Sequence, residues 1–139
     1  NSTIVGETIT NHGDINVGFV VATDEGMQIP VVRRASEKSL TVLAEEADAL
    51  TERVRQGRMQ VADTQEGTFT ISNLGMYGIT EFTAVIHQPQ TAILAVGAVR
   101  DNVLKVTLSL DHRVIDGVSA ARFLATLKEY LENPCTMLI

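Results

Sequence analysis

The sequence predicts an α/β domain in which a mixed β-sheet is flanked by two long helices. Three observations support this prediction. Apolar, β-branched segments of strand length recur along the chain, two other segments repeat apolar residues at the helical spacing, and turn-forming pairs separate these segments. With 139 residues, 45% of them hydrophobic, the chain is long enough to bury one core of its own.

Strand composition dominates the first part of the chain. The pair Gly6-Glu7 between two short β-branched segments indicates a small hairpin. Two further segments are separated by the turn TDEG, and Pro30 in the later one predicts an edge or an end to regular pairing. The strands predicted here are residues 3–5, 8–10, 14–22 and 27–32.

Two amphipathic helices are expected to flank the sheet. The first has Ser39 as its N-cap and Gly57 just after its end. The second begins after Asp116, which is also a suitable N-cap, and is stopped by Asn133-Pro134. The apolar faces are formed by Leu43, Ala47, Leu50 and Val54 in the first helix, and by Val118, Ala121, Leu124, Leu127 and Leu131 in the second.

Three more strands are predicted between the helices, at residues 67–75, 91–100 and 103–110. The last two are joined only by Asp101-Asn102, and because both residue types tolerate positive φ we expect a tight hairpin.

Charge and composition exclude several classes of protein. The chain has 11 basic and 17 acidic residues, a net charge of −6, and no basic patch, which argues against a nucleic-acid or anionic-membrane partner. No apolar run approaches the roughly 20 residues of a membrane span. The single cysteine, Cys135, permits no internal disulfide and fits a reducing compartment, and the scattered histidines form no metal-binding pattern.

The candidate chemical groups are His112 and Asp116, which lie where the last strand becomes the last helix. An imidazole has an ordinary pKa of about 6.5, so His112 could act as a general base. In the other reading, His112 is a hydrogen-bonded polar group at a strand end and Asp116 only caps the helix. The spacing alone leaves both readings open. His12 and His87 lie in or beside predicted loops and are expected to be solvated.

Several motifs resemble one family of enzymes. DHRVIDG at 111–117 is similar to the H-x-x-x-D-G signature of the acyltransferase (E2) component of 2-oxo acid dehydrogenase complexes, in the superfamily that includes chloramphenicol acetyltransferase. The segments 14–32, 67–82, 88–97 and 132–139 resemble the same family in the same order, and TISNLG and HQPQTAILAVG look most like its acetyl-transferring branch. The resemblance therefore implies a chloramphenicol acetyltransferase-like fold, with residues 1–139 as the C-terminal part of the catalytic domain and its N-terminal part absent.

The resemblance also implies a reaction and its residues. The family moves an acyl group between a dihydrolipoyl thioester, carried on a separate domain, and coenzyme A. By similarity His112 is the base that activates the thiol, and Ser72 is the hydroxyl donor to the oxyanion. Ser72, Asn73 and Gly97 would line the coenzyme A side. Asp116 resembles a family aspartate that orients the site through an ion pair with an arginine, and that arginine belongs to the part of the family domain not present here.

Assembly follows from the same resemblance. We expect a homotrimer in which His112 of one copy faces Ser72 of its neighbour, and trimers that build a cubic or dodecahedral core. Expected partners are a lipoyl domain and the E1 and E3 components, in the bacterial cytoplasm or the mitochondrial matrix. The C-terminal residues 137–139 would dock into a neighbouring trimer, or else fold back onto their own chain.

Three functional hypotheses remain: an acetyltransferase, a non-catalytic core-forming chain or inactive fragment of the same family, and a free-standing acetyltransferase for a small hydroxyl compound. The presence of both His112 and Ser72 favours the first. These two residues lie 40 positions apart (112 minus 72), about a dozen fewer than the family usually has. Either the hairpin at 101–102 is truly short or its tip is missing.

Overall fold

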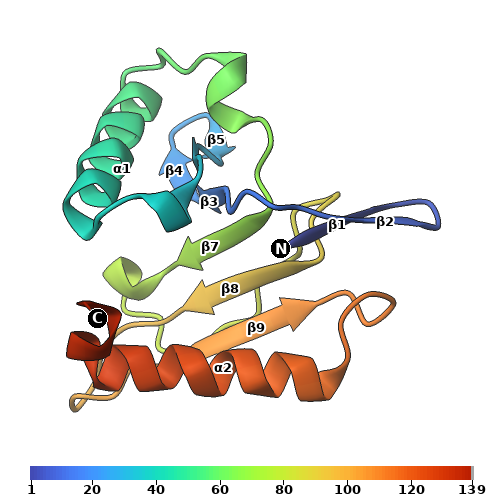
Figure 1. Cartoon of the computed structure of the whole chain (residues 1–139). Coiled ribbons are helices and arrows are strands. Elements are labelled where there is room, and N and C mark those ends of the chain that lie inside the picture. Colours follow the sequence, from blue (N-terminus) through green and yellow to red (C-terminus); the bar gives the residue numbers. More distant parts are fainter. Residues whose placement is uncertain (139) are drawn as a thin grey trace.

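The computed structural model describes residues 1–138, and its centre is a five-stranded sheet in the order β6-β3-β7-β8-β9 (Figure 1). Strands β3, β7 and β8 are parallel to one another, whereas β6 and β9 pair antiparallel with β3 and β8. The predicted mixed sheet is therefore confirmed. Its strands are β3 (Val17–Phe19), β6 (Val31–Val32), β7 (Phe69–Asn73), β8 (Ala92–Val96) and β9 (Val106–Leu110).

Two small hairpins flank this sheet. Strands β1 (Ser2–Val5) and β2 (Thr8–Asn11) form a hairpin that projects from the body of the molecule in Figure 1, and β4 (Val21–Thr23) pairs with β5 (Gly26–Gln28). The base of the first hairpin is tied to the start of β8, because the hydroxyls of Ser2 and Thr91 hydrogen-bond at 2.8 Å.

The two predicted helices are present with their predicted caps. Helix α1 (Leu40–Arg55) follows Ser39, whose hydroxyl accepts from the backbone of the first turn, and packs on β4 and β6. Helix α2 (Gly117–Glu132) lies alongside β9, and its Phe123 packs against Phe69 of β7 with ring centroids 5.9 Å apart. Short 3₁₀ turns η1, η2, η3 and η4 occupy Ala35–Glu37, Val61–Thr64, Gly75–Tyr77 and Pro134–Leu138.

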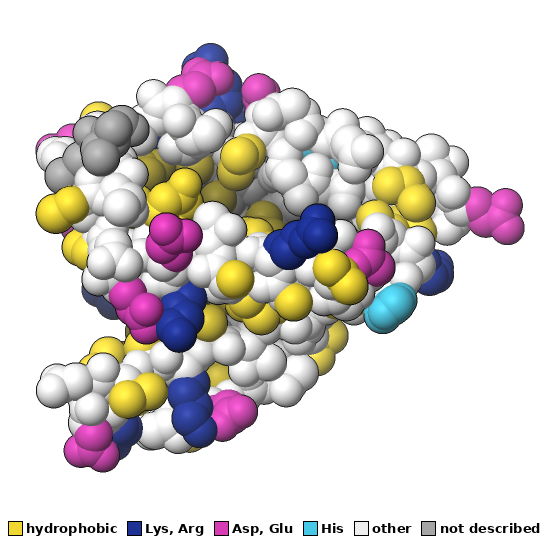
Figure 2. All heavy atoms as spheres, turned by 60° about the horizontal axis from the view of Figure 1, so that its bottom comes forward, with side chains coloured by type: hydrophobic (Ala, Val, Ile, Leu, Met, Phe, Trp, Pro, Cys, Tyr) yellow, Lys and Arg dark blue, Asp and Glu magenta, His cyan; other side chains and the backbone are white. Residues whose placement is uncertain are grey.

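The outer side of α2 is not wholly polar. Figure 2, which brings this side of the molecule forward, shows hydrophobic side chains lying between charged ones. The large apolar side chains of α2 that are exposed are Val118, Phe123, Tyr130 and Leu131. None of the helices within residues 1–138 has the length and apolar composition that crossing a membrane requires.

Two strand predictions were too long because pairing partners change along the chain. The predicted strand 14–22 is divided into β3 and β4, since β3 pairs with β7 and β6 whereas β4 pairs only with β5. The predicted strand 27–32 is divided at Pro30 in the same way. These partners come from distant parts of the chain, so local composition did not reveal the division.

The regular pairing between β8 and β9 is also shorter than predicted. The ladder between β8 and β9 ends near Gly97 because Ala98 donates its N–H to the carbonyl of Ile79 instead, at 2.7 Å. Beyond that point, Asp101 and Asn102 have φ values of 50° and 61°, so the predicted tight two-residue turn is confirmed.

Candidate active site

Ser72 lies on the last part of β7. Along this strand Thr70 and Ser72 are buried, 0% and 8% exposed, on the face opposite Phe69, which contacts α2. Within residues 1–138 the Ser72 hydroxyl has no hydrogen-bond partner, yet its oxygen is not fully enclosed. The hydroxyl is therefore held by a buried strand and free to donate to a ligand.

Asn73 and Gly97 are brought next to Ser72 at the carboxyl ends of β7 and β8. The side-chain oxygen of Asn73 accepts from the backbone N–H of Gly75 at 2.8 Å, which turns the chain away from the sheet. Gly97 follows β8 directly, and a Cβ atom there would lie 2.0 Å from the carbonyl oxygen of Thr80. Only glycine fits this close approach of two backbones, so it holds the loop after β7 against the end of β8.

His112 and Asp116 lie together at the other end of the sheet. Because β9 runs antiparallel to β8, it delivers its last residues to the start of β8, where Asp111 donates its N–H to the carbonyl of Thr91 at 2.8 Å. His112 is exposed on the turn that follows, and α2 begins five residues later.

Asp116 caps α2, as the sequence predicts. One of its oxygens accepts from the backbone N–H groups of Val118 and Ser119, each at 2.8 Å, and the other accepts from the Ser119 hydroxyl at 2.9 Å. These hydrogen bonds, led by the backbone and hydroxyl of Ser119, lower the pKa of the Asp116 carboxyl. No arginine of the described chain forms a salt bridge with Asp116, so the orienting ion pair stays a prediction.

Ser72 and His112 are too far apart to act together within one copy. Ser72 is level with Ala95 of β8, whereas the residue before His112 is bonded to Thr91. Four residues of strand, at about 3.3 Å each, separate the two positions by on the order of 13 Å. A catalytic hydrogen bond spans about 3 Å, so a site that uses both groups has to combine two copies of the chain.

Sequence reasoning missed one feature of the His112 turn. The Arg113 guanidinium folds back onto the Asp111 carboxylate, with Nη2 at 2.6 Å from Oδ2, and the residues on either side of His112 are thereby joined. This hydrogen bond and the nearby positive charge lower the pKa of Asp111 to about 2. The only signal in the sequence is an opposite charge on each side of the histidine, a pattern with no fixed structural meaning.

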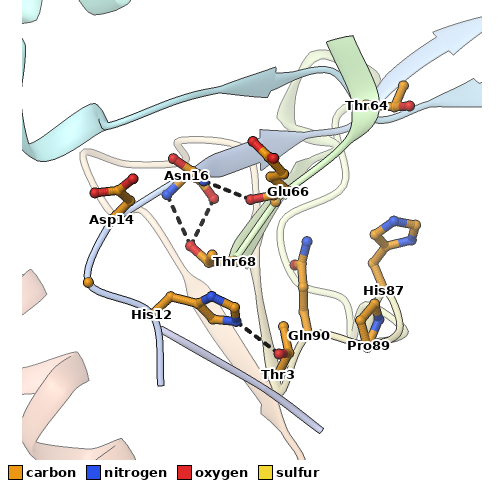
Figure 3. A pocket seen from close by; sticks show the side chains of 12 residues that line it. Thr3, His12, Asp14, Asn16, Thr64, Glu66, Thr68, His87, Pro89 and Gln90 are labelled. Carbon is orange, nitrogen blue, oxygen red and sulfur yellow. Dashed lines mark hydrogen bonds between the residues drawn. The ribbon is translucent and has the colours of Figure 1, made fainter. Parts of the chain in front are cut away.

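A cavity of about 700 Å³ contains none of the predicted site residues (Figure 3). It lies between the end of the β1–β2 hairpin and the segments that precede β7 and β8. Its walls are held by internal hydrogen bonds, among them His12 Nε2 to the Thr3 hydroxyl at 2.8 Å and Asn16 Nδ2 to the carbonyl of Glu66 at 2.8 Å. His12 is therefore a bonded side chain, where the sequence predicted a solvated one, and His87 is exposed as predicted.

The part of the chain that the structure describes contains no group of three or more His, Cys, Asp or Glu side chains placed to hold a metal ion.

The whole chain, residues 1–139, matches the sequence model of the family described as 2-oxoacid dehydrogenases acyltransferase (catalytic domain). The chain belongs to this family. It is 38% identical over 96% of its length to the dihydrolipoyllysine-residue acetyltransferase component of the pyruvate dehydrogenase complex of Rickettsia felis. It covers 35% of that relative, so the chain spans about a third of the relative's length.

Two solved structures share the fold of this acyltransferase domain. The dihydrolipoamide acetyltransferase of Azotobacter vinelandii superposes with a TM-score of 0.90 and 35% sequence identity, over the whole of this chain and 63% of that one. The cubic core of the pyruvate dehydrogenase multienzyme complex matches with the same TM-score, identity and coverage. The chloramphenicol acetyltransferase-like fold implied by the sequence motifs is thus confirmed.

Proposed function

We propose that this chain transfers an acetyl group between a dihydrolipoyl thioester and coenzyme A, in the core of a 2-oxo acid dehydrogenase complex. The observation that carries the proposal is the pair of half-sites in a chain that matches the acyltransferase family from end to end. A Ser72 hydroxyl that has no hydrogen-bond partner among residues 1–138 lies at one end of the sheet, and an exposed His112 lies at the other.

The Azotobacter structure supports the choice of residues. One serine, one histidine and one asparagine of that acetyltransferase have been investigated for their roles in its catalytic mechanism, and the asparagine lies four positions after the histidine. Asp116 follows His112 by the same four positions. The serine and histidine there lie about a dozen positions farther apart than Ser72 and His112. We propose that the tight turn at 101–102 accounts for this difference.

The Azotobacter enzyme has an asparagine four positions after its histidine, where this chain has Asp116. This difference limits the role that can be proposed for Asp116. The side-chain oxygen of asparagine caps a helix as that of aspartate does, whereas asparagine forms no ion pair with an arginine. The cap on α2 is the role that both residue types support. We therefore propose that Asp116 holds the start of α2 beside His112, and that any ion pair with an arginine is secondary to this role.

In the proposed reaction His112 removes the proton of the attacking thiol. A free thiol has a pKa of about 8.5 and is largely protonated at neutral pH, so a nearby base raises its reactivity. As the new sulfur–carbon bond forms, the Ser72 hydroxyl donates to the negative charge that develops on the thioester oxygen. The old sulfur–carbon bond then breaks, and His112 returns its proton to the departing thiol.

Asn73 and Gly97 are proposed to line the coenzyme A side because both lie beside Ser72 at the same strand ends. The dihydrolipoyl group is a substrate that another domain carries. No resident metal is needed for thiol–thioester exchange, since a base and an oxyanion donor supply the two effects that the reaction requires.

The separation of Ser72 from His112 supports a site shared between copies, and the homotrimer is the assembly that the family resemblance implies. The relative that forms a cubic core supports a larger assembly of such trimers, with a lipoyl domain and the E1 and E3 components bound through other domains. The exposed apolar side chains of α2 are also suited to burial against another subunit. In the proposed docking segment 137–139, Met137 is 45% exposed and Ile139 lies outside the described residues.

The decisive experiment mixes two inactive variants. His112→Ala and Ser72→Ala chains are prepared alone and as co-assembled trimers, and acetyl transfer between dihydrolipoamide and acetyl-CoA is measured. In random trimers, about a quarter of the shared sites pair an intact histidine with an intact serine, so about a quarter of wild-type activity should return. Activity no greater than that of the separate variants would mean that the two residues do not share a site between copies.

A further inference from the structure

The turn that carries His112 is closed by the residues on either side of it. Arg113 Nε lies 3.0 Å and 3.2 Å from the two oxygens of Asp111, and its Nη2 lies 2.6 Å from Oδ2. The backbone N–H of Arg113 also donates to Oδ1 at 3.0 Å. The side chain and the backbone of residue 113 are thus fixed to the same carboxylate.

Asp111 is itself anchored to the sheet. Its N–H donates to the carbonyl of Thr91 at 2.8 Å, and its own carbonyl accepts from Val114 and Ile115, each at 3.0 Å. Its side chain is 13% exposed, whereas that of Arg113 is 63% exposed. Asp111 is therefore the fixed member of the pair, and Arg113 closes the turn onto it.

His112 has no comparable support of its own. The residue is exposed, and within residues 1–138 its ring takes part in no hydrogen bond. The backbone from 111 to 113, which the ion pair closes, consequently sets the direction in which the His112 side chain leaves the turn. Isolated surface ion pairs contribute little to stability, but this pair is bidentate and spans a single residue.

We propose that Asp111 and Arg113 are positioning residues for the acyl-transfer reaction, and that their bidentate pair sets the direction of His112 toward the neighbouring copy. The inference rests on the proposed function, because it requires His112 to be the base. Because the pair is proposed to act through His112 alone, its loss should change coenzyme A binding little.

The predicted signature is a fall in kcat with little change in KM. A displacement of about 1 Å in a reacting group can cost about 100-fold in rate, so Asp111→Asn should lower kcat by roughly 10- to 100-fold. Arg113→Lys keeps the charge but loses the planar guanidinium, so its kcat should fall nearly as far as that of Arg113→Gln. A restored kcat in Arg113→Lys would overturn the geometric role, because charge alone would then suffice.

A double variant tests whether the two residues act as one unit. If they do, Asp111→Asn combined with Arg113→Gln should have about the kcat of either single variant. Multiplied losses would overturn the proposal. Each protein is first checked by light scattering for an intact assembly, and the rate is expressed per assembled chain. If one of Asp111→Asn and Arg113→Gln assembles poorly, the other is used in its place.

The matched control is another exposed arginine–carboxylate pair, Arg34 with Glu37 at 3.4 Å, on a segment remote from both half-sites. Glu37→Gln should leave kcat and KM unchanged, and an equal loss there would overturn the specific role of the Asp111 pair.

His112→Ala in the same assay separates the two proposals. Retained activity in His112→Ala would remove both, because there would be no base to position. An inactive His112→Ala together with a normal kcat in Asp111→Asn would remove the positioning role alone.

Discussion

The two ends of the central sheet hold their chemical groups in different ways. Ser72 lies on the buried face of β7, and the loop beside it is fixed by the close approach of Thr80 to Gly97. His112 lies on an exposed turn that is closed by charge and anchored through one backbone hydrogen bond to Thr91. Packing fixes the Ser72 end of the sheet, whereas an ion pair and a helix cap fix the His112 end.

On the proposed function, this difference follows from the role proposed for each group. An oxyanion donor works best when it is fixed before the reaction, and a buried strand provides that rigidity. A base that serves a neighbouring copy has to project from its own subunit, so it cannot be buried within it. The turn at 111–113 meets both demands, because it is exposed and yet internally bonded.

The largest expected effect is at the exposed end. His112→Ala should lower acyl transfer by about 10³-fold or more, because no other base replaces the imidazole. The measurement is kcat for acetyl transfer, with solution mass as the check that the oligomer is intact. Wild-type turnover in this variant would show that the exposed end does not supply the base.

Ser72→Ala should have the next largest effect, at the packed end. Loss of one oxyanion donor typically lowers kcat by roughly 10²- to 10³-fold. The assay is the same, and KM for coenzyme A should change little because only the hydroxyl is removed. An unchanged kcat would mean that another donor stabilises the oxyanion.

Gly97→Ala tests whether the packed end depends on backbone contact. The added Cβ would lie 2.0 Å from the carbonyl oxygen of Thr80, so the segment has to move and the free energy of unfolding should fall by about 1–3 kcal/mol. Urea unfolding measures the loss. Gly13→Ala is the control, because a Cβ there meets no atom within 4 Å. Equal stability of the two variants would contradict the close approach.

Asp116 variants separate the cap from any ion pair at the exposed end. Asp116→Asn keeps an oxygen that accepts from the start of α2, so Tm should remain near that of the wild type, whereas Asp116→Ala should lower Tm by several degrees. Thermal unfolding measures both. A Tm for Asp116→Asn as low as that for Asp116→Ala would show that the charge, not the cap, is what stabilises this end.

The smallest expected effect is on stability in acid. The folded pKa of Asp111 is about 2, below its ordinary value of 3.8, so its stabilising contribution is complete above about pH 4 and is lost as the pH falls toward 2. Asp111→Asn should therefore reduce the dependence of Tm on pH between 4 and 2 and lower Tm at neutral pH. An identical pH dependence in the two proteins would show that the carboxylate is not paired.

Local signals in the sequence predicted the ends of the helices and the tightest turn. Ser39 and Asp116 cap their helices, and Asp101-Asn102 forms the expected turn, because each of these outcomes depends on a few adjacent residues. The strand 14–22 was predicted as one element because its change of pairing partner at Val20 depends on distant segments.

The candidate site could be predicted from the sequence only in part. Resemblance to a family supplied Ser72 and His112 as a pair, but their distance depends on the order β7-β8-β9 and on the direction of β9. The bond between Asp111 and Arg113 depends on how the turn folds, and charges two positions apart do not determine that. The sequence therefore predicted the candidate residues, and the topology determined which of them lie together.

The length of β8 has a consequence for how the protein is used in the cell. On the proposed function a lone subunit carries two incomplete halves and turns over nothing, so dilution or failed assembly silences it without any inhibitor. Acyl transfer would then depend on the concentration of subunits, because only assembled copies form a complete site.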